Sequence, residues 1–470
     1  MEKRCYNTLR RRVTKRLSYK KFMQYFKEEI AMSKSTAIRG KAKAIAWLCT
    51  LVYFGSYMTR QNFGVMLLYV IGNFSASTGI PSDDMSVKLS VILTAMTISY
   101  GIGQVVCGFI GDKVKPQYML TAGLGLASVT NILMAMPFIS KADNIVLMAV
   151  LWAVNGVAHS MLWPPIVRIM SMYLTDDEYG YSAVRVSWGS QFATIILYLG
   201  CPLLVTYAKL SWRTVILICA IVGVVIDILW TVLYPKLLRN PLKESVKKSD
   251  GKKSGGVPLP VFVIVPLICI FFGIILQGIM RDGVTNWTPK LLDDTFNLGE
   301  ALSTVSAVVL AVFSIISFSA YDFVHRKLFK NEVFCAGMIF AFTAVLSLAV
   351  LAMFIFEINS AILSILLMGI IVANTHGINL MLITVVPKRF IKSGKVSLFS
   401  GVLNACTYIG AAVGNVAFAW LSTISSSGEA DSVNWTPVVI SWVAISILGL
   451  GICLAAVPLW KKFCKTYAED

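Results

Sequence analysis

Two arginines stand inside long apolar stretches of this chain, where a charge is costly. Arg60 lies in SYMTRQNF, residues 56–63, within an apolar run from about Ala44 to Val70, and Arg281 lies in a second such run. An arginine deep in a bilayer costs roughly 2.5 to 3.5 kcal/mol, so it normally faces a protein interior, a water-filled cavity or a partner. Because a guanidinium fork matches the paired oxygens of phosphate or carboxylate, two such arginines predict an anion site if the fold brings them together.

Few acidic residues are available to neutralise these arginines. In the apolar stretches only Asp227 and Asp282 are plausible counter-charges. Asp282 directly follows Arg281, and neighbours on a helix point about 100° apart, so we expect Asp282 to be a poor bidentate partner. The sequence therefore predicts more buried positive than negative charge. The alternative is a pair of structural arginines, satisfied by backbone carbonyls and Asp227.

The composition places most of the chain in a membrane. The 470 residues are 57% hydrophobic and only 14% charged, with a mean hydropathy of +0.73. A helix needs about 20 apolar residues to cross the hydrocarbon core. We predict an all-helical membrane protein with twelve spans, which start near residues 44, 88, 117, 146, 181, 213, 260, 301, 332, 360, 396 and 436.

The charges between these spans predict the orientation of the chain. Residues 1–43 hold 14 Lys or Arg against three acids, and basic residues recur in every second loop. Cytoplasmic loops carry such an excess, so both termini are predicted to be cytoplasmic, as in a multi-pass protein of the cell membrane. The net charge of +18 then belongs to loops that face anionic membrane lipid, and nucleic acid is not an expected partner.

A long polar loop, from about Pro235 to Pro258, divides the spans six and six. Weak internal sequence similarity favours a duplication. Arg60 and Arg281 both lie in the first span of a half, and Asp112 and Asp322 both stand at the end of a second span. Such doubled bundles hold their substrate at mid-depth between the halves. We expect a basic segment (1–43), a six-helix half (44–235), a linker (236–258), a second six-helix half (259–460) and a tail (461–470).

Several functional classes have no signal in the chain. The ten cysteines show no CxxC or Cys/His metal spacing and fall mainly within spans, so neither a metal site nor a disulfide framework is expected. No GxxxxGK[ST] or other nucleotide motif occurs, which disfavours ATP-driven transport. We expect no cofactor and no enzymatic activity.

Four motifs carry a resemblance to a known family. GFIGDKVKP resembles the G-x-x-x-D-(R/K) loop between the second and third spans of the major facilitator superfamily. SYMTRQNF, NGVAHSMLWPPIVR and MRDGVTNWTP look like the organophosphate:phosphate antiporters of that superfamily, whose members include glycerol-3-phosphate and hexose-phosphate carriers. The resemblance covers nearly the whole chain from residue 44 onward. It implies the twelve-helix major facilitator fold and places Arg60 and Arg281 on the family's two phosphate-binding arginines.

The chain departs from that family at three positions. Gln104 stands where the family often has a lysine on span 2, and Gln191 or Phe192 stands near a histidine of span 5. His159 stands where the family has a glutamine before the Trp-Pro-Pro of span 4. These changes remove cationic groups from the implied site, so the identity of the substrate stays open.

The implied activity is secondary transport by alternating access. Arg60 and Arg281 would hold the phosphate or carboxylate of a small organic anion, such as a sugar phosphate or glycerol phosphate, in exchange for inorganic phosphate. Tyr57, His159 and Gln104 would contact the rest of the substrate, although His159, like His376, is equally explained as a packed helix contact. A monomer is expected to suffice. The alternatives are a non-transporting membrane receptor of the same fold and a proton-coupled symporter of a small metabolite.

Other residues are predicted to shape the helices and their motion. Gly108, Gly111 and Asp112 would form a conformational latch at the cytoplasmic side. Trp163, Pro164 and Pro165 predict a kink in the fourth span. The glycines of GVLNACTYIGAAVG, Gly401, Gly410 and Gly414, are expected to permit close helix approach.

Overall fold

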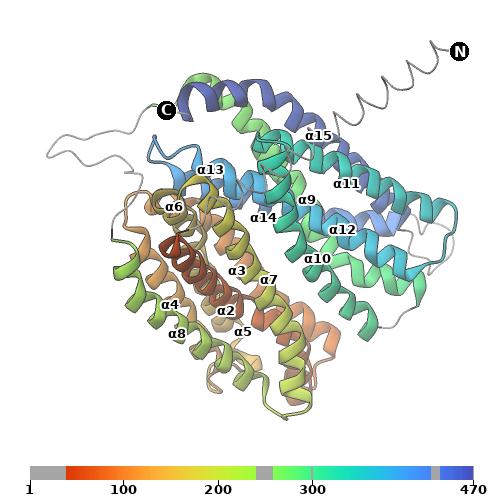
Figure 1. Cartoon of the computed structure of the whole chain (residues 1–470). Helices are drawn as coiled ribbons and strands as arrows, with labels where there is room; N and C mark the ends of the chain where they lie inside the picture. The colour runs from red at the N-terminus through yellow and green to blue at the C-terminus, as the bar shows by residue number, and fades with distance from the viewer. Residues whose placement is uncertain (1–38, 240–257, 298–299, 425–434, 469–470) are drawn as a thin grey trace, which may run out of the picture.

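The computed structural model describes residues 39–239, 258–297, 300–424 and 435–468, and these segments are almost entirely helical (Figure 1). The predicted basic segment (1–43) and linker (236–258) lie mostly outside the described residues. The helices form two groups, one before the linker and one after it, as Figure 1 shows.

The first group holds the helices that precede the linker. α2, α3 and α4 pack with α7, α5 and α8 respectively. Their bounds are α2 Gly40–Thr78, α3 Ser82–Gly111, α4 Pro116–Ala135, α5 Ile145–Ser160, α6 Trp163–Tyr173, α7 Asp176–Thr206 and α8 Trp212–Leu237.

The second group repeats this plan after the linker. α9, α10 and α11 pack with α14, α12 and α15 respectively. The bounds are α9 Ile264–Phe296, α10 Glu300–Lys327, α11 Glu332–Ile355, α12 Ala361–Asn379, α13 Val386–Lys388, α14 Val396–Ile424 and α15 Thr436–Phe463.

The predicted spans are therefore matched by helices. Within the described residues, eleven helical segments are long and apolar enough to cross a membrane. α2 is not among these eleven, although it is 39 residues long, because polar side chains interrupt it around Arg60. The outward faces are apolar, as on α8, where Ile221, Val225, Ile228 and Val232 are exposed. Such a surface suits lipid and would be unfavourable in water.

The fourth span of each group is interrupted. α5 ends at Ser160 and α6 begins at Trp163, with prolines at its first turn, which confirms the kink predicted at Trp163–Pro165. In the second group the corresponding helix passes from α12 into a π-helical segment, Leu380–Val385, before α13. Such segments often occur at functional sites, and this one begins just after His376.

Glycines let α14 lie directly against its neighbours. A Cβ added at Gly410 would stand 2.1 Å from the carbonyl oxygen of Ile275 on α9, and one added at Gly401 would stand 2.2 Å from that of Gln104 on α3. The predicted close helix approach is confirmed at both positions. α14 thereby holds the two groups of helices together, since α9 belongs to the second group and α3 to the first.

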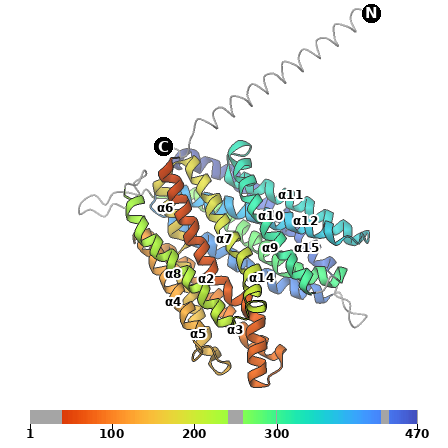
Figure 2. The same ribbon diagram turned by 60° about the horizontal axis from the view of Figure 1, so that its bottom comes forward.

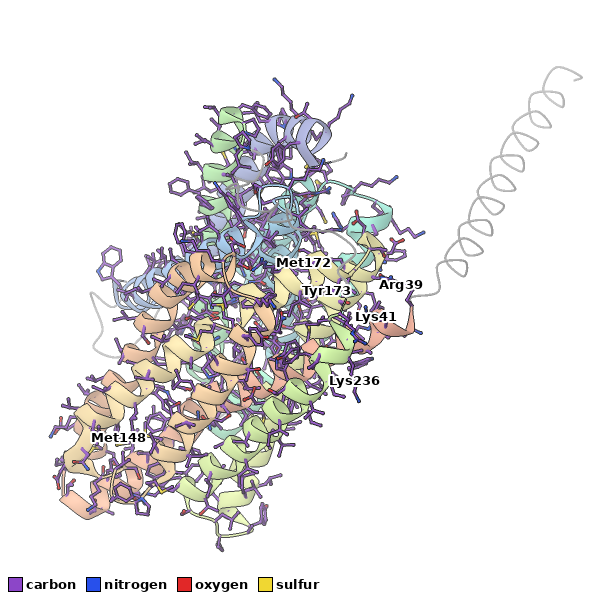
Figure 3. All side chains as sticks on the ribbon, turned by 90° about the vertical axis from the view of Figure 1, so that its left-hand side faces the viewer. Arg39, Lys41, Met148, Met172, Tyr173 and Lys236 are labelled. Atoms are coloured by element: carbon purple, nitrogen blue, oxygen red, sulfur yellow. The ribbon has the colours of Figure 1, made fainter. Side chains whose placement is uncertain are left out.

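The start of α2, the end of α8 and the end of α15 lie at one end of the bundle. Arg39 donates to the carbonyl of Tyr173 and to Glu178, and the Tyr173 hydroxyl donates to the carbonyl of Leu238. The Phe463 ring stacks on Phe390, 5.4 Å between centroids. Figure 3 shows Arg39, Lys41 and Lys236 near this end, with Met148 at the other. We call it the linker end.

Candidate functional site

A cavity of about 270 Å³ lies between the two groups of helices, at mid-depth. It receives side chains from six helices of both groups. They include Tyr57, Arg60 and Gln61 on α2, Gln191, Thr194 and Tyr198 on α7, Arg281, Asp282 and Asn286 on α9, Ser314 on α10, His376 on α12, and Tyr408 on α14.

The depth of the cavity follows from the helix register. Arg60 is twenty residues into α2, which begins at Gly40, so it lies roughly 30 Å along that helix. Arg281 is seventeen residues into α9 and lies roughly 26 Å along it. Tyr408 stands twelve residues after the start of α14, roughly 18 Å from the linker end. The cavity thus lies well inside the span of the bundle.

Arg60 is surrounded by tyrosines from both groups of helices. Its Nη2 donates to the Tyr408 hydroxyl at 2.8 Å. Its guanidinium carbon lies 4.2 Å from the ring centroid of Tyr100, 5.3 Å from that of Tyr408 and 5.6 Å from that of Tyr57. Ring faces attract a cation, and more so where water is excluded. They do not neutralise it, and Arg60 forms no ion pair with a carboxylate of the described residues.

Arg281 approaches the same tyrosine from the other group. Its guanidinium carbon lies 5.8 Å from the Tyr408 ring centroid, so both predicted arginines contact the same aromatic ring. Like charges on one ring repel each other. An anion between them would relieve that repulsion.

Asp282 changes the expected charge balance. Its two oxygens accept bonds from Arg281 Nε at 2.6 Å and Nη2 at 2.9 Å. The prediction that Asp282 is a poor bidentate partner is therefore wrong. The 100° between neighbouring positions describes where the Cβ atoms point, whereas the long arginine side chain bends back around the helix. The site carries two guanidiniums and one carboxylate, and only Arg60 lacks an acidic partner among the described residues.

Asp227 does not neutralise Arg60. It lies on α8 beside Gly125 of α4, with one oxygen 3.1 Å from where a glycine Cβ would stand, and its Oδ1 accepts no hydrogen bond within the described segments. The alternative in which Asp227 satisfies the arginines thus finds no contact here.

The turn of α2 that carries Arg60 is held by three asparagines. The Thr59 carbonyl accepts from Asn131 Nδ2 at 2.8 Å and from Asn155 Nδ2 at 3.2 Å, and Asn62 donates to Asn131 at 2.8 Å. All three asparagines are fully buried. A buried network that is satisfied in this way fixes one backbone position, here the residue directly before Arg60.

Two predicted substrate contacts stand outside the cavity lining. Gln104 and His159 are buried, and neither side chain makes a hydrogen bond within the described residues. Gln104 lies one turn beyond Tyr100 on α3, and His159 lies in the last turn of α5, which ends at Ser160. Of the five predicted substrate-binding residues, the cavity brings together Tyr57, Arg60 and Arg281.

Sequence reasoning missed the tyrosines on the other helices. Tyr100 and Tyr408 pack edge to face, 4.7 Å between centroids, and the Tyr100 hydroxyl accepts from Asn404. The only signal in the sequence was an aromatic residue within a glycine-rich span. At the position left open on span 5, Gln191 lines the cavity while Phe192 is exposed.

The predicted latch residues join the two groups at the linker end. Asp112 accepts from the backbone amides of Ser397 at 2.8 Å and Leu398 at 2.9 Å, which begin α14. A Cβ at Gly108 or Gly111 would approach the same residues to 3.0 Å or less. Burial raises the pKa of the Asp112 carboxyl, and the two amide hydrogen bonds oppose that shift.

Further contacts close the linker end between the groups. Lys388 pairs with Asp176 at 2.7 Å, and the Tyr179 hydroxyl donates to the Thr384 carbonyl. The cavity residues Tyr198, Asn286 and Val308 lie toward the opposite ends of their helices. These contacts join the two groups on the linker side of the cavity, the end at which Figure 2 shows the start of α2 and the C-terminus.

The family model described as Major Facilitator Superfamily matches residues 49–415. The chain belongs to this superfamily, a group of membrane transporters. The predicted fold is confirmed by a solved structure of the proton:xylose symporter XylE, which superposes with a TM-score of 0.68 at 12% identity over 89% of this chain and 95% of that one.

Two curated relatives extend over much of the chain. The glycerol-3-phosphate transporter of Bacillus subtilis is 24% identical over 307 residues, or 61% of this chain and 66% of the relative. The membrane sensor protein UhpC of Escherichia coli is 21% identical over 307 residues, or 60% of this chain and 66% of the relative. The match therefore spans just under two thirds of either relative, and the resemblance to organophosphate carriers is confirmed at the level of the family.

Proposed function

We propose that this chain is a secondary transporter of a small organic anion, which it exchanges for inorganic phosphate by alternating access. The favoured substrate is a phosphate ester such as glycerol phosphate or a sugar phosphate. The protein would act as a monomer in the cell membrane, with the linker end in the cytoplasm. The observation that carries the proposal is Arg60, a cation at mid-depth with three aromatic faces around it and no acidic partner among the described residues.

The position of Arg60 supports anion binding over a structural role. A structural arginine in a bundle is expected to pair with a carboxylate or several carbonyls, whereas the one hydrogen bond that Arg60 forms within the described segments goes to the Tyr408 hydroxyl. Arg281, whose guanidinium carbon lies 5.8 Å from the centroid of the Tyr408 ring, offers a second guanidinium to the same ligand. Together they provide the planar donors that phosphate oxygens prefer.

The exchange mode follows from the same charge. An empty site would leave Arg60 unneutralised while the two groups of helices move, so a bound anion favours that movement in each direction. The latch at Asp112 would hold one state closed, and its release would open the linker end. Opening of the bundle at the end opposite the linker end would release the anion on the other side of the membrane.

A membrane sensor is the second candidate, favoured by the similarity to UhpC. A sensor would bind the anion in the same cavity without moving it across. The proton-coupled alternative is favoured by Asp282, a carboxylate in the cavity lining. It predicts uptake driven by a pH gradient without internal phosphate.

The test uses the full chain reconstituted in lipid vesicles. Uptake of labelled phosphate is measured into vesicles with and without internal phosphate, and glycerol phosphate and a hexose phosphate are offered as competitors. Exchange predicts uptake only into phosphate-loaded vesicles. Phosphate binding without uptake would indicate a sensor, and uptake that follows an imposed pH gradient in empty vesicles would indicate a proton symporter.

A pair of variants tests the role of the second arginine. Arg281→Lys keeps the charge but loses the fork, so exchange should fall at least about tenfold. Arg213→Lys is the matched control, because Arg213 donates to Ser140 away from the cavity. Equal exchange by both variants and the wild type would contradict a role for the Arg281 guanidinium in holding the anion.

A further inference from the structure

Asp282 is the one carboxylate in the cavity lining that the structure describes. The exchange mechanism proposed above assigns no role to it. Its side chain is 27% exposed, compared with 14% for Arg281, so the pair is open to the cavity. A bidentate pair with both oxygens engaged holds the carboxylate in place beside Arg281.

The groups that face this carboxylate define the charge of the site. From the helices around the cavity they are Arg281 on its own helix, Arg60 and Tyr57 on α2, Tyr198 on α7, His376 on α12 and Tyr408 on α14. Among these groups, two guanidiniums and one carboxylate leave a single net positive charge.

We propose that Asp282 determines specificity by setting this net charge, so that the cavity selects singly charged anions over doubly charged ones. This inference rests on the proposed function of the site. A monoanion would bring the cavity to neutrality. A dianion would leave an excess negative charge at mid-depth in the bundle, where unpaired charge is costly. A phosphate ester would therefore bind in its singly protonated form.

The arrangement of the arginines fits this selection. Asp282 occupies Nε and Nη2 of Arg281 and leaves the remaining nitrogen available to a ligand. Among the residues that the structure describes, Arg60 forms one hydrogen bond, through Nη2 to Tyr408. A ligand thus contacts the Arg60 guanidinium, which has no acidic partner among the described residues, and the Arg281 guanidinium, which is paired with Asp282. A ligand with a single negative charge balances the charge of this arrangement.

A comparison of phosphate with sulfate distinguishes the effect of an anion's charge on binding from the effect of its shape. Both are tetrahedral, but sulfate stays doubly charged, whereas phosphate changes from one charge at about pH 5 to two at about pH 8.5. Two readouts are used on the wild type: competition for labelled phosphate exchange in vesicles, and the rise in unfolding temperature that each anion gives to the solubilised protein. We expect sulfate to bind at least tenfold more weakly than phosphate at about pH 5, and phosphate to weaken as the pH rises.

Variants at Asp282 test whether its carboxylate is responsible for the selection of singly charged anions. Asp282→Asn should raise the sulfate-to-phosphate affinity ratio at least tenfold and remove the loss of phosphate binding at high pH. Asp282→Glu keeps a carboxylate and should keep the selection. Asp294→Asn is the matched control on the same helix, because Asp294 pairs with Lys290 outside the cavity lining.

Three results would overturn the inference. The first is equal binding of sulfate and monoanionic phosphate by the wild type, which needs no variant. The second is an unchanged ratio in Asp282→Asn with no gain in affinity for either anion. The third is a uniform gain in affinity for both anions in Asp282→Asn. That result would mean that Asp282 only competes with any anion for the Arg281 guanidinium and does not select by charge. Exchange of both anions with equal ease would leave the proposed transporter intact, whereas binding of neither would overturn both proposals.

Discussion

The contact of Asp112 with α14 gives a prediction that can be worked from the structure. The amides of Ser397 and Leu398 lie in the first turn of α14, where no intrahelical carbonyl is available to them. Asp112 accepts from both, at 2.8 and 2.9 Å. A hydrogen bond to a charged group contributes about 1.5–3 kcal/mol. Asp112→Asn loses the charge, and its amide group can accept from only one of the two donors.

We expect Asp112→Asn to remove at least one of the two hydrogen bonds that keep the linker end closed. About 1.5–3 kcal/mol corresponds to an increase of about tenfold to a hundredfold in the open fraction. Hydrogen–deuterium exchange of a peptide that covers residues 396–400 measures this directly, and those two amides should exchange faster by a similar factor. Asp143→Asn, at an exposed position, is the control and should leave the exchange unchanged.

The reasoning would be refuted by equal exchange in wild type, Asp112→Asn and Asp112→Ala. That result would mean that other contacts, such as Lys388 with Asp176, keep the linker end closed on their own. Faster exchange throughout α14 in Asp112→Asn would instead indicate general loss of structure, so a peptide from the middle of α14 serves as the internal reference.

Two further changes test the positioning of the site. Gly410→Ala places a methyl group where only 2.1 Å separates it from the Ile275 carbonyl oxygen, so it should destabilise the protein by about 1–3 kcal/mol in thermal unfolding; Gly451→Ala, which meets nothing within 4 Å, should be neutral or slightly stabilising. Asn131→Ala removes the donor to the Thr59 carbonyl and should cost about 1–3 kcal/mol of stability, with weaker phosphate binding. Stability lost without any change in phosphate binding would show that the network does not position Arg60.

Much of the fold could be predicted from the sequence because a bilayer imposes simple lengths and charges. Apolar runs gave the helices to within a few residues, as where α14 begins at Val396 and α15 at Thr436. The prolines after Trp163 predicted the break between α5 and α6 for a local reason, the loss of backbone donors. A π-helical segment such as Leu380–Val385 depends on tertiary packing and has no comparable signal.

The site could be predicted only in part, since its composition depends on which helix faces meet. A lone arginine in an apolar run marks a cavity, so Arg60 and Arg281 were found. Tyr100 and Tyr408 are ordinary in such spans and become informative only when α3 and α14 are brought together. The error at Asp282 arose because helix geometry fixes the direction of a Cβ and leaves the end of an arginine side chain free to turn.

The most direct test of the account is the affinity of inorganic phosphate for Arg60→Lys, measured by equilibrium binding to the purified full chain beside wild type and Arg213→Lys. Lysine preserves the positive charge and removes the planar fork that can hold two oxygens. The account predicts that phosphate binds at least about tenfold more weakly to Arg60→Lys and equally well to Arg213→Lys. Unchanged phosphate affinity in Arg60→Lys would contradict it.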